Sequence, residues 1–222
     1  MKTIDFTKVA ENEFGSAREQ AYQKLKLRLM TLDLPPESAL DLHQLMRELS
    51  IGRTPLIEAI QRLAMEDLLT IHPRRGTVVT QPSFIQARYV FEVRDIFEGR
   101  AARLAAQRAS EPDLQMLRQI LAEQLQQAEQ QDFKNFLLLD YRLHLEVARL
   151  SGNPFLARTL DHVLTLNTRL WFSFFHLQGI QVNRLYSHEP ILNAIERRDP
   201  EAAEAAAVAH TLQAKESLFS MF

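Results

Sequence analysis

The chain of 222 residues has no cysteine and no long uninterrupted run of apolar residues. Without cysteine it forms neither disulfides nor thiolate metal sites, which agrees with a reducing compartment. No stretch approaches the roughly 18 consecutive apolar residues of a membrane span. The first eight residues also lack the apolar core of a secretory signal. These absences predict a globular protein of the cytoplasm that does not enter a membrane.

An excess of positive charge is missing as well. The formal net charge is −2, and residues 18–80 hold nine Lys and Arg against eight Asp and Glu. A domain that binds nucleic acid is usually basic, so this balance argues against DNA binding. Placement can offset this balance, because the cations of this region could share one surface; they are Arg18, Lys24, Lys26, Arg28, Arg53, Arg62, Arg74 and Arg75.

Residues 40–79 nevertheless follow the pattern of a winged helix. Apolar residues recur at helical spacing in two short segments, which a turn at residues 50–52 separates. The second segment opens with Arg53-Thr54-Pro55. Proline is tolerated there because the N–H that it lacks has no partner within the helix. Arg and Thr at a helix N-terminus suit phosphates and base edges in a major groove.

Two short strands are expected after these helices. Leu69 and Ile71 alternate with polar residues, residues 77–80 are mostly β-branched, and Pro73-Arg74-Arg75-Gly76 lies between the two runs. Two arginines in a turn are, on their own, more often simply solvated. Next to a helix-turn-helix pattern they predict a hairpin tip that contacts the sugar-phosphate backbone or a minor groove.

The rest of the chain is helical in pattern. We expect one helix ahead of the motif at residues 14–32, and later helices at residues 84–109, 114–131, 132–151 and 154–177 and on both sides of a turn at Asp199. About six helices after residue 83 form an all-α bundle that is large enough to enclose a cavity. The predicted fold is therefore mostly α, with an N-terminal winged helix-turn-helix and a C-terminal helical bundle. The predicted domains are a tail at 1–10, the winged helix at 11–80, a linker at 81–83 and the bundle at 84–222.

One aspartate and three histidines in the predicted bundle form a candidate metal site. Asp140 and His144 are four residues apart, so they share one helix face, about 6 Å apart along the axis. His188 and His210 each stand 11 residues from Asp199, so two antiparallel helices would bring them to similar heights, although a proline after His188 loosens this inference. An Asp/His₃ set suits Zn²⁺, Ni²⁺, Mn²⁺ or Fe²⁺ and leaves positions for a ligand carboxylate.

The N-terminal pattern resembles the DNA-binding domain of GntR-family bacterial transcription regulators. The positions that match are Ile51, Arg53, Thr54, Pro55, Leu56, Glu58, Ala59, Ile60, Leu68, Arg75 and Gly76. Three positions depart from the family: Gly52 replaces a hydroxyl residue, Ile57 replaces an arginine of the recognition helix, and His43 stands where a basic residue is common. The candidate DNA contacts are His43, Arg53, Thr54, Pro55, Arg62, Arg74, Arg75 and Gly76. The missing cation at Ile57 predicts an unusual operator or a modest affinity.

The C-terminal half resembles the FCD effector domain of the FadR-type branch of that family. The matches are Asp140-x-x-x-His144, Ser151-Gly152-Asn153-Pro154, the segment that opens at His188, and the alanine-rich helix that carries His210. The resemblance implies that Asp140, His144, His188 and His210 hold a metal and that a small organic acid binds beside it. Arg94 matches an arginine that is common in the domain's first helix. It either pairs with an effector carboxylate or forms a structural salt bridge.

The sequence thus favours a ligand-responsive transcription regulator over an enzyme. It predicts a homodimer that binds operator DNA, with an affinity that a small organic acid at the metal site modulates. Two alternatives remain open at this point. One is a metal-dependent enzyme that acts on a small carboxylate, although no partnered base beside the Asp/His₃ site is evident. The other is a purely structural metal that holds the bundle closed.

Overall fold

A computed structural model describes residues 16–178 and 187–220. Contacts between residues divide the chain into two compact units, Met1–Pro82 and Ser83–Phe222. The first unit, called the head below, is a winged helix-turn-helix, and the second is a helical bundle, as the sequence predicts. Among the described residues, no helix is both long enough and apolar enough to cross a membrane.

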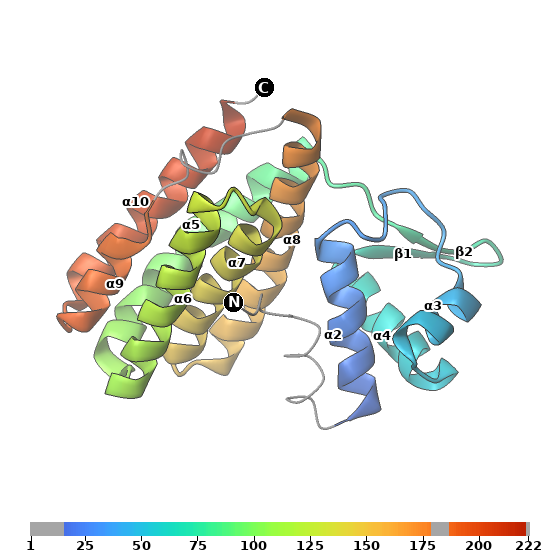
Figure 1. Cartoon of the computed structure of the whole chain (residues 1–222), viewed down its shortest axis with the longest axis horizontal. Coiled ribbons are helices and arrows are strands. Elements are labelled where there is room, and N and C mark those ends of the chain that lie inside the picture. Colours follow the sequence, from blue (N-terminus) through green and yellow to red (C-terminus); the bar gives the residue numbers. More distant parts are fainter. Residues whose placement is uncertain (1–15, 179–186, 221–222) are drawn as a thin grey trace. The chain divides into compact units, whose positions relative to one another are not determined.

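The described part of the head, residues 16–82, contains three helices and a β-hairpin. Its elements are α2 (Ala17–Met30), α3 (Leu42–Leu49), α4 (Arg53–Met65), β1 (Leu69–His72) and β2 (Gly76–Val79). The two strands are antiparallel, and Ala39 adds an isolated bridge to Val78. The loop of the hairpin reaches beyond the three helices of the head (Figure 1).

Apolar stripes on α2 and α4 form the core of the head. The buried residues of these stripes are Ala21, Leu25 and Leu29 on α2 and Leu56, Ala59, Ile60 and Leu63 on α4. On α3 only Leu45 is buried. Asp41 caps the start of that helix, since its carboxylate accepts from the backbone N–H of Gln44 at 2.9 Å, and Ser50 follows its end with a φ of 54°, which turns the chain toward α4.

The hairpin differs from its predicted burial. Leu69 is buried, but Ile71 is 48% exposed, so the expected alternation does not continue along β1. The two strands pair from Leu69 with Val79 to His72 with Gly76. Ile71 pairs with Thr77, next to the pair of His72 and Gly76 that closes the hairpin.

The second unit contains six described helices, which pack on one another as a bundle (Figure 1). They are α5 (Phe84–Arg108), α6 (Glu111–Glu129), α7 (Phe133–Leu150), α8 (Pro154–Gln178), α9 (Glu189–Glu196) and α10 (Pro200–Phe219). The helices α5 and α10 run antiparallel, because Phe84 packs on Phe219 near one end and Arg103 pairs with Glu201 near the other. The α7 helix packs against α5, α6 and α8.

Polar caps set most helix boundaries of this unit. Ser83 and Asp199 cap α5 and α10, since their side chains accept from the N–H groups of Gln86 and Ala202. The α6 helix begins three residues earlier than predicted, at Glu111. The Ser110-Glu-Pro-Asp segment is its capped first turn rather than a separator, because proline is tolerated there.

The helix ahead of the motif also ends earlier than predicted, at Met30. Leu32 adopts a positive φ of 61°, which stops the helix before the predicted end. The predicted start at residue 14 lies outside the described residues.

Candidate metal centre and DNA-contacting surface

Three histidines from different elements meet inside the second unit. His144 lies in α7, His188 is the residue that precedes α9, and His210 lies in α10. All three are buried, and each offers a ring nitrogen within 4.8 Å of the others. Such a cluster is of the kind that can hold a metal ion. Asp140, one turn before His144, completes the four residues that the sequence singles out.

The distances in the cluster fit a common ion. The Nε2 atoms of His144 and His188 are 3.1 Å apart. Two nitrogens that bind one ion at about 2.0–2.1 Å stand about 3 Å from each other. Oδ1 of Asp140 lies 3.2 Å from Nε2 of His188, and Oδ2 lies 4.0 Å from Nε2 of His144. The carboxylate therefore borders the same point as the imidazoles, and the Gln124 amide, which donates to Oδ1 at 3.2 Å, holds it there.

Glu98, a buried carboxylate of α5 that was not predicted as a site residue, contacts the cluster. Oε2 of Glu98 is 2.9 Å from Nδ1 of His144, and Oε1 accepts from Nε of Arg94. Arg94 also donates from NH1 to the side-chain oxygen of Asn167 at 2.9 Å. Arg94 thus forms the salt bridge that was one of its two expected roles, and a contact with an effector stays a prediction. The four-residue spacing of Arg94 and Glu98 in one helix is the sequence signal from which their ion pair could have been predicted.

Burial and neighbouring charges shift the pKa values of the three imidazoles in different directions. Burial lowers the pKa of His210 far below its usual value, and the neighbouring His188 and His144 add to this. Burial also lowers the pKa of His188, against the opposing pull of Asp140. For His144 burial acts in the same sense, but the charge and hydrogen bond of Glu98 outweigh it and raise the pKa.

Both carboxylates near the cluster stay ionised. Burial raises the pKa of Asp140, but the hydrogen bond from His188 and the charge of His144 outweigh it and lower the pKa overall. Burial likewise opposes ionisation of Glu98, but Arg94 and His144 hold its pKa well below the usual range. The cluster therefore combines anionic oxygen with mostly neutral imidazole, which is the protonation state that binds a divalent cation.

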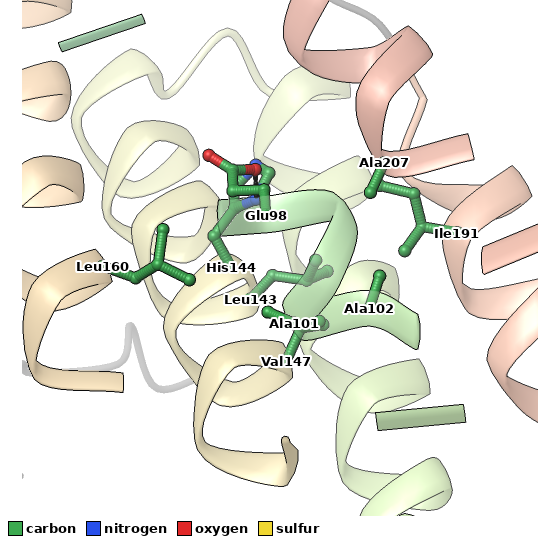
Figure 2. A pocket seen from close by; sticks show the side chains of 9 residues that line it. All are labelled: Glu98, Ala101, Ala102, Leu143, His144, Val147, Leu160, Ile191 and Ala207. Carbon is green, nitrogen blue, oxygen red and sulfur yellow. Dashed lines mark ion pairs between the residues drawn. The ribbon is translucent and has the colours of Figure 1, made fainter. Parts of the chain in front are cut away.

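A small cavity borders the cluster on the α5 side. Glu98 and His144 lie close together at one end of it, and apolar side chains, among them Leu160 and Ala207, line the rest (Figure 2). The volume within this cavity that the centre of a water molecule can occupy is about 10 Å³. That volume suits about one water molecule, so an organic acid does not fit without movement of the lining.

The predicted DNA contacts of the head are mostly exposed. Arg53 and Thr54 form the exposed start of α4, where backbone N–H groups without helical partners also point outward. Pro55 is half-buried in that turn, and His43 is exposed on α3. At the tip of the hairpin Arg74, Arg75 and Gly76 are exposed, with positive φ at Arg74 and Gly76.

Arg62 differs from these residues. Its guanidinium lies 3.4 Å from the ring centre of Tyr22 and pairs with Glu19 and Glu66 at 3.0 and 3.2 Å. It joins α4 to α2 inside the head, and contact with DNA would compete with these partners.

Three of the cations of α2 have partners or cover within the head that the sequence does not show. Lys26 is buried. Arg18 pairs with Glu58 at 3.4 Å, and Arg28 pairs with Glu48 at 2.5 Å. These carboxylates lie on α4 and α3, so the charges of α2 are neutralised by tertiary contacts that sequence spacing does not show.

Family models match both units of the chain. The model of the FCD domain matches residues 89–213, which is more than half of the chain. The model described as bacterial regulatory proteins, gntR family, matches residues 17–79.

Individual proteins agree with both matches. The chain is 26% identical over 208 residues to the HTH-type transcriptional repressor RspR of Escherichia coli (strain K12), which covers 93% of this chain and 91% of that protein. It is 27% identical over 213 residues to the HTH-type transcriptional regulator LutR of Bacillus subtilis (strain 168), with 86% and 95% covered. The solved structure of E. coli McbR/YncC shares the fold, with a TM-score of 0.82 at 21% identity over 94% of this chain and 99% of that chain. The chain belongs to the GntR family of bacterial transcription regulators, which are DNA-binding proteins rather than enzymes, in the FadR-like branch that carries a C-terminal FCD domain.

Proposed function

We propose that this regulator responds to a small organic acid that binds beside a divalent metal ion in its helical unit. The observation that carries the proposal is the buried convergence of His144, His188 and His210 from separate elements. With Asp140 they form a donor set for Zn²⁺, Ni²⁺, Mn²⁺ or Fe²⁺. Four protein ligands leave one or two positions on the ion, and a carboxylate of the acid fills them.

The metal, rather than Arg94, is the first anchor of the acid. Arg94 is 1% exposed and is already bonded to Glu98 and Asn167, so an effector reaches it only by displacing one of these partners. Asp140 keeps 18% of its side chain exposed, against 5% for His144 and 2% for His188. We therefore place the approach of the acid on the Asp140 side of the cluster.

The head supplies the DNA contacts of the proposed regulator. Arg53, Thr54 and Pro55 at the start of α4 enter a major groove, while the Arg74–Gly76 loop follows the backbone or a minor groove. Two copies of the chain, acting in the cytoplasm, each read one half-site of an operator. Residues 11–80 form the DNA-binding domain and residues 84–222 form the metal- and effector-binding domain.

Metal analysis followed by a thermal-shift screen of small carboxylic acids tests the sensing half of the proposal. An acid that binds the folded protein raises its melting temperature by mass action. The same acid should change operator affinity about 5- to 150-fold in a gel-shift series, which corresponds to a coupling of about 1–3 kcal/mol. His144→Ala should abolish both responses. If His144→Ala lowers thermal stability but keeps the response to the acid, the metal is structural and the proposal fails.

Two arginine substitutions test the DNA-binding surface. Arg53→Ala should weaken operator binding by about 1–3 kcal/mol if Arg53 reads a base. Arg18→Ala is the matched control, because Arg18 is also exposed but pairs with Glu58 on α4. Equal losses for both variants in the same gel-shift series would contradict the proposed role of the α4 N-terminus.

A further inference from the structure

Glu98 connects the metal cluster to a helix that supplies none of the four candidate ligands. Those ligands lie in α7, before α9 and in α10, whereas Glu98 lies in α5. Its side chain is 6% exposed, and Oε2 lies 2.9 Å from Nδ1 of His144. In Figure 2 the two side chains lie together at one end of the cavity.

The Glu98 carboxylate is held in place through both of its oxygens. Oε1 accepts from Nε of Arg94, one turn earlier in α5. Oε2 faces Nδ1 of His144 at 2.9 Å. Arg94 is itself fixed by its bond to Asn167 of α8. The carboxylate therefore cannot turn away from His144 without breaking a buried ion pair, which is costly.

This contact selects one tautomer of His144. A carboxylate beside Nδ1 requires a proton on that nitrogen, so in the neutral ring Nε2 carries the free electron pair. Nε2 is the atom that faces His188 and Asp140. Histidines that bind metals generally donate their other N–H to such a partner, which orients the ring and makes it a better ligand.

We infer that Glu98 is the positioning residue for His144 in the metal site and that Arg94, in turn, holds Glu98. The inference rests on the proposed function, since it concerns the same metal site. It gives Arg94 a task before any effector binds. The task differs from simple bracing of α5 against α10, because Asp95–Lys215 and Arg103–Glu204 already link these helices at 3.5 and 3.0 Å.

The test measures metal binding by the full-length protein, with Zn²⁺ in competition with a chelator and Co²⁺ as a spectroscopic probe. Glu98→Gln should weaken Zn²⁺ binding about 10- to 100-fold and change the visible spectrum of bound Co²⁺. Asp95→Asn is the matched control, because it removes an α5–α10 ion pair that does not touch His144. Its Zn²⁺ affinity and Co²⁺ spectrum should remain those of the wild type.

A double variant keeps the test decisive if Glu98→Gln, which takes the carboxylate partner from the buried Arg94, fails to fold. Arg94→Gln with Glu98→Gln removes both charges and should show the same 10- to 100-fold loss. If the folded double variant keeps the Zn²⁺ affinity and the Co²⁺ spectrum of the wild type, the inference about Glu98 is wrong. The proposed metal site is not contradicted by that result. Failure of the wild type itself to bind Zn²⁺ or Co²⁺ would overturn the proposed metal site, and this inference with it.

Discussion

Among the single residues of the cluster, His144 is the imidazole that takes up a proton most readily. Burial lowers the pKa of all three rings, but only at His144 does a carboxylate, Glu98, outweigh burial and raise the pKa. His188 and His210 remain below their usual range. A proton and a metal ion compete for the same cluster, because a ligand must be deprotonated to bind.

The pH dependence of metal affinity follows from the order of the three histidine pKa values. Because the pKa of His144 is raised, the loss of affinity on acidification should begin above about pH 6.5, the ordinary histidine value. Co²⁺ titrations between about pH 5.5 and 8.5 measure the onset. In Glu98→Gln the onset should move to lower pH, because the negative charge that favours the protonated ring is gone. A wild-type affinity that is constant from about pH 6 to 8 would contradict this assignment.

At the scale of secondary-structure elements, the close packing of α5 on α10 depends on Gly99. A Cβ at this position would lie 2.8 Å from Cγ2 of Val208 and 3.4 Å from the backbone oxygen of Glu204. Gly99→Ala should therefore push α10 away from α5 and destabilise the protein. Overpacking costs about 1–3 kcal/mol, which exceeds the gain of roughly 0.5–1 kcal/mol from alanine in a helix.

A second substitution separates the clash from any other effect of Gly99→Ala. Val208 is 42% exposed, so Val208→Ala alone should cost little. The double variant should be at least as stable as the wild type, because the clash is removed and the helix gains alanine. Urea unfolding of the four proteins gives the coupling, and strictly additive changes would show that Gly99 and Val208 do not meet.

The metal cluster shows how far sequence spacing predicts tertiary structure. Asp140 and His144 share a face because a helix dictates it, and the equal distances of His188 and His210 from Asp199 anticipated their meeting. Glu98 was not assigned, because its contact with His144 crosses 46 residues between two helices and no local period encodes it.

The surface of the head also contains contacts between elements that sequence spacing does not predict. The buried stripe of α4, which consists of Leu56, Ala59, Ile60 and Leu63, follows the helical period. The pairing of Arg18 with Glu58 and of Arg28 with Glu48 depends on how α2 packs against its neighbours. Exposed cations therefore cannot be counted from sequence alone, because their partners lie in other elements.

At the scale of the whole molecule, a metal ion would act on one unit directly. The candidate ligands and Glu98 belong to the second unit, where they connect α5, α7, α10 and the start of α9. The described part of the head has its own core, built from α2 and α4, and supplies none of the candidate ligands. Loss of the ion should thus loosen the bundle and leave the head folded.

Hydrogen exchange of the full-length protein, with and without a chelator, measures this division. Removing the ion should speed exchange around His144 in α7, around His210 in α10 and at the start of α9, which lose their common anchor, and in the middle of α5 through Glu98. Exchange in α2 and α4 should stay unchanged when neither DNA nor an organic acid is present. His144→Ala provides the control, since chelator should have no further effect on it. Equal loosening of both units would show that the head depends on the metal for its own stability, and the ion would then be a general structural support rather than the anchor of an effector site.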